Sequence, residues 1–206
     1  MKPAKTALLV IDMQNGFCSP RGSLARIGVN VSAFAAVVAE VSLLVAAARE
    51  RAATIIFTQH CYARGYPNPG IEIRRLHPRL PWVDGLLAGT WDSDIVDELT
   101  PQSGERVMQK SRYDAFIGSD LETVLRRASI TNVVLSGVAT NSCVESTART
   151  AAQLDFDVAV ASDATAATSA EWHRCALRAI EYGFGSVMPW RKIFAIPGAG
   201  SGGGTR

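Results

Sequence analysis

The sequence predicts an α/β fold, a three-layer α-β-α sandwich around a mostly parallel, six-stranded, Rossmann-like sheet. Short runs rich in β-branched and aliphatic residues alternate with longer segments whose apolar residues recur at helical spacing. This alternation is typical of βα units around a parallel sheet that is buried on both faces. The chain has 206 residues, 48% of them hydrophobic, which is enough to bury a complete core.

Six short apolar runs are expected to form the strands of this sheet. They are residues 7–11, 54–58, 106–109, 133–136, 158–161 and 186–188. Between the first two runs, residues 31–51 carry Phe34, Val37, Val41 and Leu44 on one face of a helix. This spacing predicts a long amphipathic helix that covers one side of the sheet.

Three further helices are expected between the later strands. Ser119 followed by Glu122 has the spacing of a capping box, which predicts a helix through residue 127. Asn141 or Ser142 is expected to cap a helix that runs to residue 154, and residues 170–182 complete the set before Gly183.

Residues 60–90 interrupt this alternation with several prolines and glycines, two histidines and Trp82. A loop of this length inside a compact domain is more often functional than idle, so we expect it to form a lid or one wall of a pocket. No internal repeat or shift in composition marks a domain boundary. We therefore expect a single domain over residues 1–197, and a flexible Gly/Ser-rich tail over residues 198–206.

The charge balance and the apolar runs exclude several classes of protein. Lys and Arg number 21 against 19 Asp and Glu, so the chain has no basic footprint for nucleic acid. Asp12 closes the first apolar run after five residues, and no other run is expected to approach membrane length. These features predict a cytoplasmic protein without nucleic-acid or membrane partners.

The four cysteines, Cys18, Cys61, Cys143 and Cys175, contain no CxxC pair. This spacing suits neither a zinc ribbon nor a disulfide framework, and it indicates free thiols in a reducing compartment. Cys143 is the exceptional one, while Cys175 on the last helix is expected to pack in the core.

The ligand crevice of an open α/β sheet lies at the carboxyl ends of the strands, so the residues after each strand are the candidates for chemistry. Cys143 lies at or near the first turn of the helix after the fourth strand. There the helix dipole favours a thiolate and can lower a cysteine pKa from about 8.5 to about 3.5–7.5. The preceding small, polar loop, residues 137–142, can present backbone N–H groups to an oxyanion. The alternative is that Cys143 is a small buried hydrophobe.

A cysteine nucleophile also needs a base, usually histidine. Among the three histidines only His60 follows a strand, in the loop after the second run. Asp12, after the first strand, and Lys110, after the third, are the alternative: Asp12 would take the thiol proton and Lys110 would hold the carboxylate. Taken singly, Asp12 is as readily a turn cap and Lys110 a solvated strand end.

Three segments, residues 8–17, 110–116 and 136–149, resemble the signature blocks of the isochorismatase-like cysteine hydrolases in order and spacing. The resemblance spans residues 6 to about 188. It implies that Asp12, Lys110 and Cys143 form the catalytic triad. It also implies a cis peptide bond between Val138 and Ala139, and an oxyanion hole made by the N–H groups of Ala139 and Cys143.

Departures from relatives within this family narrow the expected chemistry. Nicotinamidases carry a metal-binding Asp-x-His after the second strand, whereas this chain reads Gln59, His60, Cys61 and Tyr62. We therefore expect no metal and no other cofactor, with His60 and His77 as the only remaining candidate pair. Isochorismatase itself works without the cysteine nucleophile, so the presence of Cys143 favours cleavage of a C–N bond.

Residues 89–92, 95–99 and 139–147 most resemble the ureidoacrylate and biuret amidohydrolase branch, whose substrates are small amides or ureido (N-carbamoyl) compounds. Gln59 and Asn141 are expected to hydrogen-bond such a group, with Phe17 and Tyr113 as an apolar wall. The resemblance also implies a homodimer or homotetramer.

The resulting hypothesis is a cysteine-dependent amidohydrolase that cleaves a C–N bond of a small amide or ureido substrate through a thioester-like intermediate. Its alternatives are a metal-dependent nicotinamidase-like hydrolase, an isochorismatase-type hydrolase and a non-catalytic binding protein on the same fold. Glu145 and Arg149, four residues apart on one helix, are expected to form an ion pair or a subunit contact.

Overall fold

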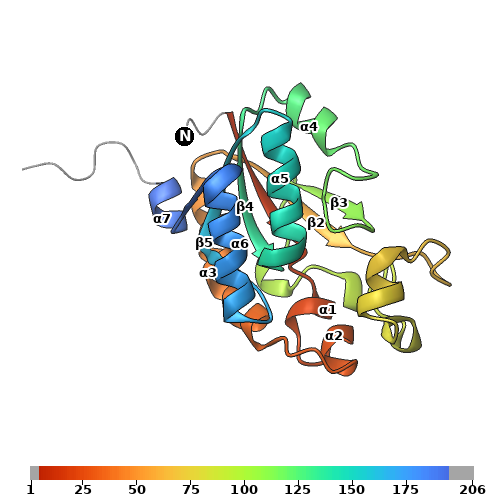
Figure 1. The fold of residues 1–206 in the computed structure, drawn as a ribbon. Helices are drawn as coiled ribbons and strands as arrows, with labels where there is room; N and C mark the ends of the chain where they lie inside the picture. The colour runs from red at the N-terminus through yellow and green to blue at the C-terminus, as the bar shows by residue number, and fades with distance from the viewer. Residues whose placement is uncertain (1–4, 195–206) are drawn as a thin grey trace, which may run out of the picture.

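A six-stranded sheet runs through the centre of the computed structural model, which describes residues 5–194 (Figure 1). Its strand order is β3-β2-β1-β4-β5-β6, and all neighbouring strands are parallel. The strands are β1 (Thr6–Ile11), β2 (Thr54–His60), β3 (Arg106–Lys110), β4 (Asn132–Val138), β5 (Asp157–Ala166) and β6 (Ser186–Met188). The six expected strands are confirmed, although β5 continues well beyond the expected end at residue 161.

Helices cover both faces of the sheet, which confirms the three-layer sandwich (Figure 1). Helix α3 (Ser32–Glu50) packs on one face, and α4 (Leu121–Arg127), α5 (Glu145–Gln153) and α6 (Ala170–Gly183) pack on the other. All six residues of β1 are buried, because this central strand meets a helical layer on each side. Three single-turn helices, α1 (Asn15–Cys18), α2 (Ser23–Arg26) and α7 (Trp190–Ile193), complete the layers.

The strand order reverses beside β1, and this reversal places the site. The chain moves from β1 outward to β2 and β3, then returns to β4 on the other side of β1. At such a switch point the carboxyl ends of the two central strands leave a crevice between their loops. Ile11 at the end of β1 lies in register with Gly137 near the end of β4, so the segments that follow them are neighbours.

Helix α3 corrects one expectation about membrane length. It has 19 residues, and an 18-residue window within it has a mean hydropathy of 1.7, so the helix is long and apolar enough to cross a bilayer by length and composition alone. Its buried residues, Phe34, Val41 and Leu44 among them, instead pack on the sheet in the same cluster as Leu8 and Val10. We therefore read α3 as the core helix of the domain.

Two helix starts differ from those expected. The Ser119 hydroxyl accepts a hydrogen bond from the N–H of Leu121 and donates to the Ala115 carbonyl. Helix α4 begins at Leu121, and its N-cap residue is Asp120 and not Ser119. The predicted capping box with Glu122 is therefore wrong. After β4, a wider turn, η6 (Thr140–Val144), precedes α5, so the helix expected from residue 141 or 142 begins at Glu145.

The expected loop over residues 60–90 contains only short turns. They are η2 (Glu72–Leu76) and η3 (Leu80–Val83), and η4 (Trp91–Ser93) and η5 (Asp97–Leu99) follow before β3. Of the single domain expected over residues 1–197, the structure describes residues 5–194. The expected tail, residues 198–206, lies outside the described residues.

Gly137 is required where β4 passes β1. Its φ is +100°, and a Cβ atom at this position would lie 2.1 Å from the carbonyl oxygen of Ile11. A side chain here would therefore meet backbone that cannot move without disturbing the sheet.

We predict that Gly137→Ala lowers the free energy of unfolding by at least about 3 kcal/mol, because it adds a backbone clash to an unfavourable φ. Gly104→Ala is the matched control: Gly104 has φ +91°, but nothing lies within 4 Å of its Cβ position. That change should cost only about 1 kcal/mol. Urea unfolding measures both, and equal losses in the two variants would contradict this account of Gly137.

Candidate active site

Three strand ends bring Asp12, Lys110 and Cys143 together at the switch point. Asp12 directly follows β1, Lys110 is the last residue of β3, and Cys143 lies in η6 after β4. Lys110 Nζ lies 2.7 Å from Asp12 Oδ2, and both side chains are fully shielded from solvent. The three residues that the sequence proposed as a triad are therefore neighbours.

The Asp12 carboxylate is held through both of its oxygens. Thr58 of β2 donates its hydroxyl to Oδ1 at 2.6 Å, and the same hydroxyl accepts the backbone N–H of Asp12 at 3.1 Å. Lys110 donates to Oδ2 and also to the carbonyl of Arg112 at 2.9 Å. Burial alone would lower the pKa of Lys110, but the Asp12 carboxylate raises it, so Lys110 remains an ammonium.

The Cys143 thiol does not have the lowered pKa that its place near a helix start suggested. Burial raises its pKa well above the ordinary value, and the Asp12 carboxylate acts in the same direction, while Lys110 opposes them. The resting residue is therefore a thiol, since loss of water outweighs the helix dipole at this depth. A base must take the proton when the sulfur attacks.

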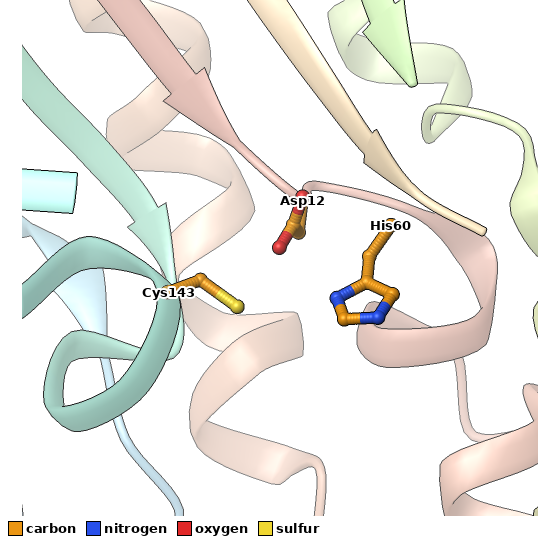
Figure 2. A group of neighbouring side chains, drawn as sticks. All are labelled: Asp12, His60 and Cys143. Atoms are coloured by element: carbon orange, nitrogen blue, oxygen red, sulfur yellow. The ribbon is translucent and has the colours of Figure 1, made fainter. Parts of the chain in front are cut away.

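Asp12 and His60 both lie close to the thiol. One potential ligand atom from each of Asp12, His60 and Cys143 lies within 4.8 Å of the others, and the three side chains point into a common space (Figure 2). The ammonium of Lys110 already contacts two of them, Asp12 Oδ2 at 2.7 Å and His60 Nδ1 at 3.4 Å. Because a fixed cation bridges these atoms, the geometry favours the ammonium over a metal ion here.

His60 links the triad to a carboxylate that the sequence analysis did not single out. Its Nε2 lies 3.0 Å from Oε2 of Glu72 and 2.9 Å from the hydroxyl of Tyr62, which donates to the same oxygen at 2.7 Å. Burial alone would raise the pKa of Glu72, but the charge and hydrogen bonds of His60 and Tyr62 lower it to about 2. Glu72 therefore stays ionised at neutral pH. Its only sequence signal was its place in the long loop after β2.

Cys143 opens into a cavity of about 820 Å³. Of the residues expected to contact substrate, Phe17, Tyr113 and Asn141 line this cavity. The loop after β2 contributes Glu72, Leu76 and His77, which confirms the expectation that it forms one wall of a pocket. Helix α6 contributes a further part of the cavity lining through Trp172, Cys175, Ala176 and Ala179.

Gln59 is not among the described residues that line the cavity. Its side-chain amide donates to the carbonyl of Ser93 at 3.1 Å. Side chains of a strand alternate between faces, and Thr58 and His60 on either side of Gln59 are the ones that reach Asp12 and Lys110. The structure therefore does not bring Gln59 to the cavity with Phe17, Tyr113 and Asn141.

The turn between β4 and Cys143 has the expected backbone. The peptide bond between Val138 and Ala139 is cis, as the family resemblance implied. Thr140 exchanges a hydrogen bond with Thr165 at 3.0 Å, and Thr165 donates to the Gly137 carbonyl at 2.6 Å, which fixes the turn against β5. Ala139 and Cys143, the expected oxyanion hole, both line the cavity.

The remaining cysteines show one correction. All four cysteines are free thiols, as expected. Cys175, however, is exposed and lines the cavity instead of packing in the core. On α6 the buried face carries Ala176 and Ile180, and Cys175 lies about 100° around the helix from the first of these. Glu145 and Arg149 form the expected ion pair, at 2.7 Å.

A family model described as Isochorismatase domain matches residues 6–192. The ureidoacrylate amidohydrolase RutB of Pantoea ananatis (strain LMG 20103) is 38% identical over 197 residues, which cover 90% of this chain and 79% of that protein. The same-named protein of Pseudomonas syringae pv. syringae (strain B728a) is 40% identical over 201 residues, covering 91% and 81%.

A solved structure with the same fold is a cysteine hydrolase from Pseudomonas syringae pv. phaseolicola 1448A. It has a TM-score of 0.84 at 30% identity and covers 94% of this chain and 92% of its own. N-carbamoylsarcosine amidase from Thermoplasma acidophilum has a TM-score of 0.73 at 25% identity, covering 90% and 96%. The likeness seen in three short segments thus extends along the chain, and the protein belongs to the isochorismatase domain family.

Proposed function

We propose that this protein is a cysteine-dependent amidohydrolase that cleaves a C–N bond of a small amide or ureido compound. The observation that carries the proposal is a buried thiol, Cys143, at the wall of a cavity and beside the paired Asp12 and Lys110. The names of relatives support the substrate class, because they include ureidoacrylate amidohydrolases and an N-carbamoylsarcosine amidase.

The first half of the reaction forms a covalent intermediate. Asp12 takes the proton of the Cys143 thiol as the sulfur attacks the amide or carbamoyl carbon, forming an S–C bond. The backbone N–H groups of Ala139 and Cys143 stabilise the oxyanion. The tetrahedral species then collapses with cleavage of the C–N bond, and Asp12 returns its proton to the nitrogen, which leaves as ammonia.

The second half releases the acyl or carbamoyl group. Asp12, again a carboxylate, takes a proton from water as the water oxygen attacks the thioester-like carbon. The S–C bond breaks, and the proton held by Asp12 restores the Cys143 thiol. The products are ammonia with a carboxylic acid or a carbamate, so the overall reaction is hydrolysis and needs no cofactor.

Lys110 and Asn141 have supporting roles in this scheme. The ammonium of Lys110 holds the Asp12 carboxylate in place and lowers the pKa of Cys143 against the effect of burial. Asn141, Tyr113 and Phe17 line the cavity, which supports a role for them in contacting the substrate. Free thiols at all four cysteines suit action in the cytoplasm.

A non-catalytic binding protein on the same fold is the rival of a different class. We expect Cys143→Ala and Cys143→Ser to reduce ammonia release to below about one part in a thousand of the wild-type rate, because Cys143 is the cysteine that both lies close to Asp12 and lines the cavity next to it. Ammonia release over small amides, ureido acids and alkyl ureas is the measurement. Cys18→Ala, which removes a buried thiol outside the cavity, is the control and should keep its activity. Full activity in the Cys143 variants would rule out the covalent scheme.

The ionised Glu72 makes the folded protein more stable at neutral pH than at low pH. In the unfolded chain a Glu takes up a proton near about pH 4.3, whereas folded Glu72 resists protonation down to about pH 2. Its lowered pKa therefore contributes stability that is fully present above the unfolded pKa and is lost as the pH falls towards 2.

We predict that Glu72→Gln is less stable than the wild type at pH 6.5, and that the gap narrows by about 2 kcal/mol at pH 3. Urea unfolding of both proteins at the two pH values gives this double difference. A gap that stays constant with pH would show that Glu72 does not keep its charge.

A further inference from the structure

We propose that the cavity selects an uncharged amide or ureido compound carrying an apolar chain, and that it disfavours substrates bearing a carboxylate. This inference rests on the proposed function and specifies its substrate class. It departs from what the name ureidoacrylate implies for the relatives, because that name denotes a ureido acid.

The first argument is the charge around the cavity. Its described lining contains the carboxylates of Glu72 and Glu145 but no lysine and no arginine. The nearby Lys110 ammonium is already paired with Asp12, and Arg149 is paired with Glu145 while its guanidinium lies 4.3 Å over the ring of Phe184. A substrate carboxylate would thus lose water without meeting a free cation, which is costly.

The titratable groups that face this space strengthen the charge argument. Burial lowers the pKa of His77, so this imidazole is neutral near pH 7, and the lowered pKa of Glu72 keeps that carboxylate charged. Cys143 and Tyr113 have raised pKa values and remain uncharged, again because of burial. The described lining of the cavity therefore offers a substrate carboxylate no cation that is free of a partner.

The second argument is the size and polarity of the space. A cavity of about 820 Å³ is in the range that holds drug-sized ligands, about 300–1,000 Å³, and exceeds what a ureido group alone can fill. Most of the remaining lining is apolar and comes from three stretches of the chain: Leu24, Val29, Phe34, Leu76, Trp172, Ala176 and Ala179. This wall is continuous with Cys143, so an apolar chain attached to the reacting group is the ligand that fits it.

The third argument concerns the reacting end. A primary amide or terminal ureido group carries N–H donors and one carbonyl acceptor. Glu72 can accept such donors, Asn141 can donate and accept, and Ala139 and Cys143, whose N–H groups are the proposed donors to the carbonyl oxygen, line the same cavity. An uncharged amide or urea therefore matches the polar part of the cavity without an additional cation.

The direct test compares substrates that differ in one feature. Hexylurea and 6-ureidohexanoate share a chain, and only the second carries a carboxylate; methylurea lacks the chain. We expect kcat/KM for ammonia release from hexylurea to exceed that of 6-ureidohexanoate by at least about tenfold. It should exceed that of methylurea by about three- to fourfold per buried methylene. Equal or faster turnover of 6-ureidohexanoate would overturn the proposal.

A charge placed in the wall provides the matched test in the protein. Leu76 and Ile71 are exposed aliphatic residues, 59% and 55% accessible, at the two ends of the same short segment, but only Leu76 lines the cavity. Leu76→Arg should reduce the preference for hexylurea over 6-ureidohexanoate by at least about threefold. Ile71→Arg adds the same charge outside the cavity and should leave that ratio unchanged. An equal effect of both variants would contradict a site-specific origin.

The outcomes separate this inference from the proposed function. If no urea or amide in the panel releases ammonia in a reaction that depends on Cys143, the proposed function fails. If turnover depends on Cys143 but favours the carboxylate, only the substrate class is overturned. If turnover depends on Cys143 but not on chain length, the apolar half of the inference fails.

Discussion

A carboxylate and an ammonium meet inside this protein with no access to water, and the rest of the site is arranged around them. Asp12 follows β1 and Lys110 ends β3, so their contact at 2.7 Å spans the intervening strand β2. Thr58 of β2 supplies the remaining hydrogen bond to Asp12. Each charge alone would be expensive to bury, and removal of one partner from such a pair costs about 3–5 kcal/mol. The pair therefore links three strand ends.

In the proposed mechanism the pair also determines how the cysteine works. Burial raises the pKa of Cys143, so the thiolate is not stored in the resting protein and the proposed reaction depends on proton transfer to Asp12. Lys110 donates to the Asp12 carboxylate at 2.7 Å and holds it in place where no water reaches. Behind Lys110, His60 and Glu72 continue the buried polar network towards the cavity wall. Structure and chemistry thus rely on the same buried ions.

Most of the fold, and the meeting of Asp12, Lys110 and Cys143 at one site, could be predicted from the sequence, because they depend on signals that are local in the chain. Alternating apolar runs indicate the strands, and the carboxyl end of each run identifies Asp12, Lys110 and Cys143. The family resemblance added the cis peptide bond between Val138 and Ala139, which local chemistry alone does not predict.

What could not be predicted depends on direction and on long-range packing. Gln59 and His60 are adjacent in sequence, but a strand turns them to opposite faces, and only one of them reaches the site. Cys175 was expected in the core because it lies on the last helix, but its position around the axis of α6 turns it towards the cavity. Glu72 joins His60 and Tyr62 through the folding of an irregular loop, which has no periodicity to interpret. The prediction of a low pKa for Cys143 was wrong because burial raises that pKa, and burial depends on tertiary packing that the local sequence does not reveal.

The most direct test of this account is the coupling free energy between Asp12 and Lys110. Urea unfolding of the wild type, Asp12→Asn, Lys110→Met and the double variant gives this energy as a double-mutant cycle. A structure that depends on the buried pair predicts a coupling of about 3 kcal/mol or more, with the double variant more stable than the sum of the single losses implies. Additive losses, with a coupling below about 0.5 kcal/mol, would contradict it.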